Sequence, residues 1–386
     1  MKKKFRGKYI AANPLLLAFL KTMDFILRSK QRAKKVPIVP NLIKKVLLSN
    51  IAHIGDVIIA TCAIEVVKKA YPNAQIDFLT CSSSKIVVEQ HPDISNIHIL
   101  DHFKHNRKKT SLFSKVFQHF CSAKKALKSV KNENYDIAID LYFFFPNSVY
   151  FLSRAHIPTR IGFSSAGFGR LLSHSKIWKQ KDQHVVDYYR ELFDLIHINP
   201  EFTSNLFASL PKYPIDIEQK FGLNEYVIFH PGSGAKHKEW DIEKWRKLLH
   251  QFEEDGKKVV FSGNGPYERK MIKAISPRAY NLCSQLTWGD LVELVRAANL
   301  VVCVDTSIQH IAAAFKTPCI TLLTGINAPK LFSGNVSTSI PLYVHTLCFT
   351  CNRNRGCKSM SCIQNITVNR VKKECDTLLT QVLLNV

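Results

Sequence analysis

The sequence is poor in acidic residues. It holds 30 Asp and Glu against 54 Lys and Arg, which gives a formal net charge of +24 over 386 residues. Residues 1–45 contain thirteen basic residues and a single acid, Asp24, and residues 104–131 contain nine basic residues and no acid. Together the two segments carry 21 of the 24 excess charges. We therefore expect anionic partners for these segments and an ordinary charge balance elsewhere.

The sequence also lacks an apolar run long enough to span a bilayer. The run Pro14–Leu20 is short, and Lys21, Asp24 and Arg28 interrupt the residues after it. Apolar residues nevertheless recur at helical spacing between flanking basic residues. This pattern favours a helix lying in the interface of an anionic membrane. The alternatives are a helix packed on the domain and a disordered basic arm.

No small-residue cleavage site of a signal peptide comes after this apolar run. Eleven Cys without such a signal indicate a reducing compartment. We therefore expect a cytoplasmic protein, bound peripherally to the inner face of the cytoplasmic membrane. The sequence shows no recognised nucleic-acid motif, so we expect no specific nucleic-acid partner.

Strand-like and helical patterns alternate along most of the chain. This alternation predicts parallel sheets covered on both faces. A Pro-marked stretch near residues 199–214 separates two such series, so we expect two doubly wound α/β domains that face one cleft. The expected parts are a basic extension (1–43), an N-terminal domain (44–205), a C-terminal domain (206–367) and a final helix (368–386).

Asp56 follows the first predicted strand, Val46–Leu48, in a loop that leads into a helix. Ligands of open α/β sheets bind at such loops, at the carboxyl ends of strands. Asp56 can act as the N-cap of the helix. Alternatively, its carboxylate is displayed in the cleft as a general base.

A glycine-rich loop follows the first strand of the second series, at residues 230–241. Gly232 and Gly234 allow backbone amides to approach a ligand, Ser233 adds a hydroxyl, and Lys236 and Lys238 are able to meet phosphate. The spacing fits neither a Walker loop nor a dinucleotide fingerprint.

The helix after this loop has its own start signal. Trp240 and Trp245 flank Asp241 as a hydrophobic staple flanks an N-cap, so we expect structural roles for these three residues. Lys238 would then be held against a fixed helix start.

Two further loops combine a strand end with a helix start. In residues 262–268, Pro266 is placed near the first helical position, and Glu268 either complements the helix dipole or accepts hydrogen bonds from sugar hydroxyls. In residues 304–314, the strand ends in Asp305-Thr306-Ser307, and the following helix start would favour a diphosphate. Asp305 or Thr306 can instead be the helix cap, and His310 a packed polar residue.

The order of these motifs resembles glycosyltransferase family 9, the ADP-heptose:lipopolysaccharide heptosyltransferases. The resemblance rests on residues 54–79, 230–249 and 301–332 and runs from about residue 44 to the C-terminus. It implies the GT-B arrangement of two Rossmann-like domains, with the acceptor on the N-terminal domain and the nucleotide sugar on the C-terminal one.

The resemblance also implies roles for individual residues. Asp56 matches the proposed general base of the family, and Lys238 matches the Lys that contacts the donor diphosphate. Glu268 matches, more loosely, an acid that contacts the nucleotide sugar. The remaining donor-binding positions form the signature over the donor phosphates, in which Ser307 replaces the commoner Gly: Asp305, Thr306, Ser307 and His310.

These roles imply an inverting transfer of heptose from ADP-heptose to a hydroxyl of the lipopolysaccharide inner core. No Asp-x-Asp occurs in the chain, so a metal-bridged diphosphate is not indicated, and the family is metal-independent by resemblance. The alternative is the same fold acting on another nucleotide sugar or glycan acceptor. A non-catalytic sugar-binding relative and a nucleic-acid-binding protein are less favoured.

Two features remain open. The basic segment 104–131, with Lys108 and Lys109, either binds the acidic acceptor or is a solvated helix face. Cys348, Cys351, Cys357 and Cys362 have spacing that suits a structural zinc, and the alternatives are free thiols or a disulfide. We expect no cofactor to be required for the reaction.

Overall fold

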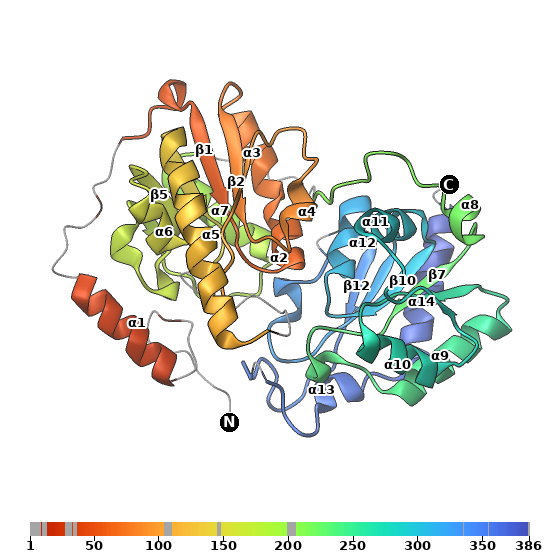
Figure 1. The fold of residues 1–386 in the computed structure, drawn as a ribbon. Coiled ribbons are helices and arrows are strands. Elements are labelled where there is room, and N and C mark those ends of the chain that lie inside the picture. Colours follow the sequence, from red (N-terminus) through yellow and green to blue (C-terminus); the bar gives the residue numbers. More distant parts are fainter. Residues whose placement is uncertain are drawn as a thin grey trace. The chain divides into compact units, whose positions relative to one another are not determined.

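The computed structural model describes residues 9, 14–27, 33, 37–103, 110–144, 148–198, 206–334, 336–353 and 355–384. The chain forms two compact units, and the boundary between them falls between Phe207 and Ala208. Each unit contains one six-stranded sheet in which the paired strands are parallel (Figure 1). In the described part of the chain, no helix has both the length and the apolar character needed to cross a bilayer.

The N-terminal sheet has the strand order β3-β2-β1-β4-β5-β6. Its strands are β1 Lys45–Ser49, β2 Gln75–Thr80, β3 Ile97–Ile99, β4 Ile137–Asp140, β5 Thr159–Phe163 and β6 His174–Lys176. The connecting helices are α2 Ile54–Ala60, α3 Cys62–Ala70, α4 Lys85–Val88, α5 Leu112–Glu133, α6 Val149–Arg154 and α7 Val185–Phe193. Val46, Leu47 and Leu48 are successive residues of β1 and all are fully buried. Burial of consecutive residues is typical of a parallel sheet that is covered on both faces.

The C-terminal sheet has the order β12-β11-β10-β7-β8-β9. Its strands are β7 Val227–His230, β8 Val259–Phe261, β9 Tyr280–Asn281, β10 Leu300–Val304, β11 Cys319–Leu322 and β12 Ser339–Leu342. Its helices are α8 Ile217–Phe221, α9 Ile242–Glu254, α10 Pro266–Ile275, α11 Trp288–Ala297, α12 Ile308–Phe315, α13 Ser361–Gln364 and α14 Val368–Leu384. Numbered from the start of their own unit, both sheets follow the order 3-2-1-4-5-6 of the Rossmann fold.

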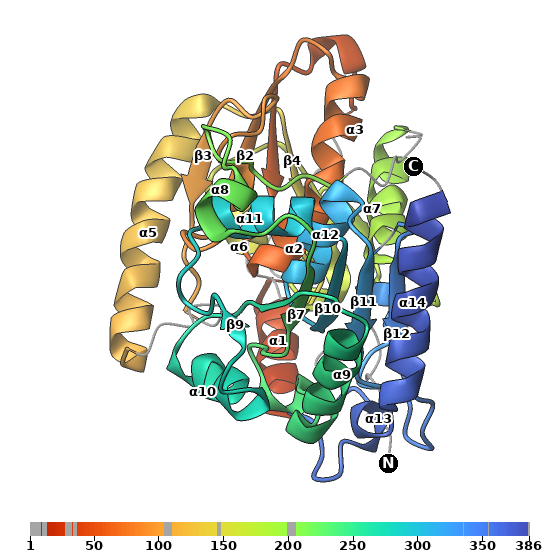
Figure 2. The same cartoon turned by 90° about the vertical axis from the view of Figure 1, so that its right-hand side faces the viewer.

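The final helix belongs to the C-terminal core. Val371, Cys375 and Leu378 of α14 are buried in one cluster with Trp245 and Phe252 of α9. Figure 2 shows α14 running beside the C-terminal sheet. The final helix predicted at 368–386 is present as α14, Val368–Leu384, and it packs as part of the unit that precedes it.

The first described helix, α1 Pro14–Ile26, is packed on the N-terminal unit by one face. Leu17 and Leu20 are buried in a cluster with Phe168 and Leu172. The carboxylate of Asp24 accepts hydrogen bonds from the Tyr9 hydroxyl (2.8 Å) and the Phe168 amide (2.7 Å). The opposite face leaves large apolar side chains exposed: Leu15, Phe19, Phe25 and Ile26. Packing on the domain thus explains the buried face of α1. Membrane binding by the exposed face stays a prediction.

Candidate active site

In each sheet the strand order reverses between the first and fourth strands of the unit. Polar side chains lie near the carboxyl ends of these two strands in both sheets. In the N-terminal sheet β1 pairs with both β2 and β4, so the connections from β1 and β4 leave toward opposite sides of the sheet. Such switch points leave an opening at the carboxyl ends of the strands. Ser49 at the end of β1 lies opposite Asp140 at the end of β4.

Asp56 lies in the first turn of α2, just beyond β1. The N-cap of this helix is His53, and the backbone amide of His53 donates to the Asp56 carboxylate at 3.2 Å. Asp56 therefore occupies the third helical position, and the alternative that it is the N-cap residue is wrong. The hydrogen bond from the helix start orients the half-buried carboxylate.

Asn50 fixes the loop between β1 and α2. It is fully buried, its side-chain amide donates to the carbonyl oxygen of Asp56 at 3.1 Å, and its oxygen accepts from the Ala52 amide at 3.2 Å. A rigid loop of this kind holds Asp56 in place before any ligand binds.

Asp140 is a second carboxylate of this site that the sequence reasoning missed. Ser148 donates to its Oδ1 at 2.6 Å, while its buried Oδ2 has no hydrogen-bond partner among the described residues. Burial raises the pKa of Asp140 to about 7, although the Ser148 hydrogen bond opposes this shift. The side chain therefore titrates near neutral pH.

Asp56 and Asp140 both influence the pKa of the same two tyrosines, Tyr142 and Tyr189. Burial raises the pKa of both Tyr142 and Tyr189. The negative charges of Asp56 and Asp140 raise both values further, at Tyr189 after the contribution of Cys62. The two carboxylates therefore lie in one electrostatic environment. Asp140 stands at the end of a predicted strand, and this strand lies next to the one that precedes Asp56. The strand-end position was the sequence signal that could have identified Asp140.

The C-terminal switch point lies between β7 and β10, which pair in parallel with Cys303 opposite His230. Lys238, in the loop after β7, forms an ion pair with Asp305, which follows β10. The distance from Lys238 Nζ to Asp305 Oδ2 is 2.7 Å. The structure thus brings together two predicted donor-binding residues that are 67 positions apart in the sequence.

The environment of Asp305 favours its charged form. Burial alone would raise the pKa of this carboxyl group, but the charge and hydrogen bond of Lys238 lower it below its usual value. Gln309 also donates to Asp305 Oδ1 at 3.1 Å. The N-cap of α12 is Ser307, so the alternative that Asp305 or Thr306 caps this helix is wrong. Thr306 and Ser307 lie half-buried at the helix start, and His310 is buried within its first turn.

Glu268 lies against the glycine-rich loop. A Cβ atom at Gly232 would lie 2.3 Å from Glu268 Cδ, and one at Gly263 would lie 2.7 Å from a carboxylate oxygen. Glycine is therefore required at both positions for this close approach. The carboxylate accepts from the Asn264 amide at 2.7 Å, and burial raises the pKa of Glu268. The predicted Pro266 at the first helical position is confirmed.

Ser233 is engaged within its own loop. Its buried hydroxyl donates to the carbonyl oxygen of Ala235 at 2.7 Å and lies 3.2 Å from the Ala235 amide. A role for Ser233 in donor binding stays a prediction. The next residues of the loop form a short 3-10 helix, Lys236–Lys238, that carries the paired lysine.

The staple predicted after this loop is confirmed. Asp241 is the N-cap of α9 and accepts from the Glu243 amide at 2.9 Å. Trp240 and Trp245 are buried and meet edge to face, with ring centroids 5.4 Å apart. Lys238 is thereby held two residues before a rigid aromatic anchor.

The four clustered cysteines show no metal-binding geometry. Within the described ranges, no group of three or more His, Cys, Asp or Glu side chains is arranged to hold a metal ion. Cys351 and Cys362 are buried, Cys357 lies 3.9 Å from the Met360 sulfur, and Cys348 is exposed. Structural zinc at these residues stays a prediction. Lys108 and Lys109 lie outside the described residues.

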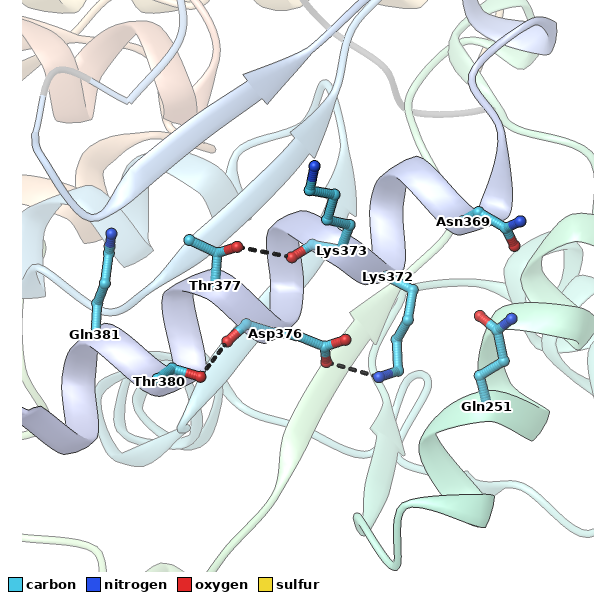
Figure 3. A pocket seen from close by; sticks show the side chains of 8 residues that line it. All are labelled: Gln251, Asn369, Lys372, Lys373, Asp376, Thr377, Thr380 and Gln381. Carbon is cyan, nitrogen blue, oxygen red and sulfur yellow. Dashed lines mark hydrogen bonds and ion pairs between the residues drawn. The ribbon is translucent and has the colours of Figure 1, made fainter.

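A surface groove of the C-terminal unit runs along α14 beside α9 (Figure 3). Lys372 crosses it and forms ion pairs at 2.6 Å with Asp255 and Asp376. The groove contains none of the residues that the sequence predicts for catalysis or donor binding. It is therefore separate from the candidate active site.

Solved structures with the same architecture define the class of this protein. A glycosyltransferase family 9 structure from Veillonella parvula matches with a TM-score of 0.69 at 20% identity, covering 88% of this chain and 97% of that one. The ADP-heptose lipopolysaccharide heptosyltransferase II of E. coli matches with a TM-score of 0.64 at 19% identity, covering 87% and 99%. The two Rossmann-like domains are therefore those of the GT-B fold class, as the sequence predicted.

Sequence comparison gives the family. The model of glycosyltransferase family 9 (heptosyltransferase) matches residues 123–352, and the chain belongs to this family. Lipopolysaccharide heptosyltransferase 1 of Escherichia coli K12 is 24% identical over 298 residues, covering 75% of this chain and 90% of the relative. Heptosyltransferase 3 of the same strain is 24% identical over 288 residues, covering 69% and 79%. The protein is thus a glycosyltransferase. The family match includes Lys238 and Asp305 but begins after Asp56.

The buried Asp140 gives a prediction for pH dependence. Its pKa is about 7 in the folded protein and 3.8 in an unperturbed chain, so the folded state binds the extra proton between these values. The free energy of unfolding should therefore fall as pH rises from 4 to 7, by up to about 1.4 kcal/mol per pH unit from this one group.

Asp140→Asn, which still accepts from Ser148, should remove this part of the slope in urea titrations. Asp182→Asn, at an exposed site of the same unit, is the control for loss of a carboxylate. An unchanged slope in Asp140→Asn would contradict the assignment.

Proposed function

We propose that the protein transfers a heptose from ADP-heptose to a hydroxyl of the lipopolysaccharide inner core, with inversion at the anomeric carbon. The observation that carries the proposal is the Lys238–Asp305 pair at the switch point of the C-terminal domain, inside the region matched to the family. The names of the relatives give the donor and the acceptor: two are lipopolysaccharide heptosyltransferases, and one solved heptosyltransferase of E. coli has ADP bound.

The donor side of the proposal rests on fixed positive charge. Lys238 is one-third exposed and is held by Asp305, so its ammonium group needs little reorganisation to meet a diphosphate. The amides and dipole at the start of α12, with the Thr306 and Ser307 hydroxyls beside them, add further stabilisation. Both groups favour the charge that develops on the leaving ADP. Glu268 is proposed to accept hydrogen bonds from hydroxyls of the nucleotide sugar.

The acceptor side of the proposal rests on Asp56. Its carboxylate takes the proton of an acceptor hydroxyl while the oxygen forms a bond to the anomeric carbon of the heptose. The bond from that carbon to the diphosphate oxygen breaks, and ADP leaves with the electron pair. A single displacement of this kind inverts the anomeric configuration. Because the chain has no Asp-x-Asp, we propose that the reaction needs no metal ion and proceeds in excess chelator.

The proposal includes the place where the protein works. A lipid-linked acceptor lies at a membrane, and the N-terminal segment is both basic and apolar. The exposed face of α1 carries Leu15, Phe19, Phe25 and Ile26. Such a face, flanked by basic residues, suits peripheral binding to the cytoplasmic side of an anionic membrane.

The donor and the base are tested together by measuring transfer to heptose-free lipid core from ADP-heptose and from UDP- and GDP-sugars. We expect transfer from ADP-heptose only, and a product whose anomeric configuration, read by NMR, is opposite to that of the donor. Asp56→Asn should lower kcat at least a hundredfold, because a general base contributes about 10² or more. Asn still accepts from the His53 amide, so the helix start is preserved.

Each other result has a defined meaning. Calorimetry of ADP binding to Asp56→Asn should match the wild type, which separates lost chemistry from lost folding. Transfer from a UDP- or GDP-sugar would keep the fold and the base but replace the proposed donor. Full activity of Asp56→Asn would refute the role of Asp56.

The role of Lys238 is tested by Lys238→Met with Lys236→Met as the matched control. The control lysine lies two residues away, and its ammonium group lies over the Tyr267 ring at 4.9 Å. We expect Lys238→Met to weaken ADP binding at least about tenfold, since a hydrogen bond to a charged group contributes about 1.5–3 kcal/mol. Lys236→Met should change it much less. Equal effects would show that only general positive charge matters.

The basic segment before and within α5 is tested by charge reversal. Lys108→Glu combined with Lys109→Glu should raise the KM for the phosphorylated lipid acceptor and leave the KM for the donor unchanged, because these lysines belong to the acceptor domain. Steady-state kinetics with each substrate varied in turn distinguishes the two constants. A similar change in both would refute acceptor binding by this segment.

A further inference from the structure

The first half of α5 makes few contacts with the N-terminal unit. No side chain of residues 112–122 is buried, whereas Ala126 and Val130 of the second half are buried in the core. The first half is tied to the unit mainly near its end, where His119 Nδ1 lies 2.7 Å from the carbonyl oxygen of Asp101 and the Asp101 amide donates to the Ser122 hydroxyl at 3.0 Å. Figure 2 shows α5 at the outer edge of its unit.

This unpacked half carries three exposed phenylalanines, which we name the aromatic stripe: Phe113, Phe117 and Phe120. Their exposed fractions are 82%, 63% and 67%. Their spacing, i, i+4 and i+7, places them on one helix face, turned away from the face that Ala126 and Val130 bury. Leu112 adds a further exposed apolar side chain at the helix start. An exposed apolar surface of this kind marks an interaction site.

Lysines continue the same helix face. Lys124 and Lys128 follow Phe120 at intervals of four residues, and both are exposed. At 1.5 Å per residue, Lys124 lies about 10 Å along the helix from Phe117. The helix has no acidic residue before Glu133, and four more basic residues precede it at positions 104–109. The apolar side chains near the start of α5 suit the acyl-chain boundary of a membrane. The lysines further along the helix suit its anionic head groups.

We propose that the aromatic stripe docks into the interface of an anionic lipid bilayer, with Lys124 and Lys128 at the level of the lipid phosphates. Charge complementarity selects this partner over a second copy of the chain. A second copy would bring another stripe flanked by lysines, on a protein of net charge +24, and the like charges would repel. The inference uses the N-terminal unit alone, so it does not depend on the identity of the donor.

The test is sedimentation of the full-length protein with vesicles of phosphatidylglycerol and phosphatidylcholine in equal parts, and with vesicles of phosphatidylcholine alone. We expect binding to the anionic vesicles that weakens with added salt. Phe113→Ser combined with Phe117→Ser should lower the partition coefficient at least about tenfold, because each buried Phe contributes strongly to transfer from water. Lys124→Glu combined with Lys128→Glu should lower it as well and reduce its salt dependence.

The matched control replaces two large exposed side chains of the other unit, Tyr213→Ser with Leu347→Ser, and should bind vesicles as the wild type does. A second comparison changes α1 by Leu15→Ser with Phe19→Ser. Loss of binding in the α1 variant but not in the stripe variant would overturn the proposal. So would equal loss in the control, or no binding of the wild type to anionic vesicles.

Two further measurements distinguish membrane docking from self-association and from misfolding. Light scattering in solution should show the same mass for the wild type and the stripe variant, and a wild-type dimer that the stripe variant dissociates would overturn the proposal in favour of a second copy. Circular dichroism and ADP binding should be unchanged in the stripe variant. Vesicle binding through the stripe without heptose transfer would leave this inference standing and refute the proposed function.

Discussion

The reversal of strand order within each sheet is the constraint on which the candidate site depends. β7 pairs with both β8 and β10, so the loops after β7 and β10 start from neighbouring strand ends. The first loop leads into α9 and the second into α12. Only this arrangement brings Lys238 and Asp305 within 2.7 Å of each other. The ion pair holds a flexible lysine in position, so its positive charge is available at a defined point rather than averaged over many rotamers.

The same constraint acts on the N-terminal sheet with opposite chemistry. There Asp140 ends β4 beside the end of β1, and Asp56 lies in the first turn of the helix that follows β1. Burial raises the pKa of Asp140 to about 7, so this carboxyl group is partly protonated at neutral pH. Each switch point thus gathers charged side chains: Asp56 and Asp140 in the N-terminal unit, and Lys238 and Asp305 in the C-terminal unit.

The sequence predicted the parts of the fold that have strong local signals. Consecutive apolar residues identified β1, β7, β10 and β11, and the Asp241 cap with its two tryptophans identified the start of α9. Short elements escaped, including β6 at the edge of the N-terminal sheet and β9 with two residues, because such strands are specified by their pairing and not by their own pattern. The helix predicted after Asp56 is in fact two helices, α2 and α3, that meet at Thr61, whose hydroxyl donates to the Ile58 carbonyl oxygen at 2.6 Å.

Local signals left the roles of the site residues open for a related reason. A helix start attracts the same residue types whether it binds a ligand or only completes its own hydrogen bonds. The structure shows which residues hold the N-cap positions: His53 in α2 and Ser307 in α12, so neither Asp56 nor Asp305 is the N-cap residue. Asp140 does not lie at a helix start. Only the pairing of β4 with β1 shows that it belongs to the same site as Asp56. Carboxylates whose positions are set by partners distant in the sequence can be assigned only when the topology is known.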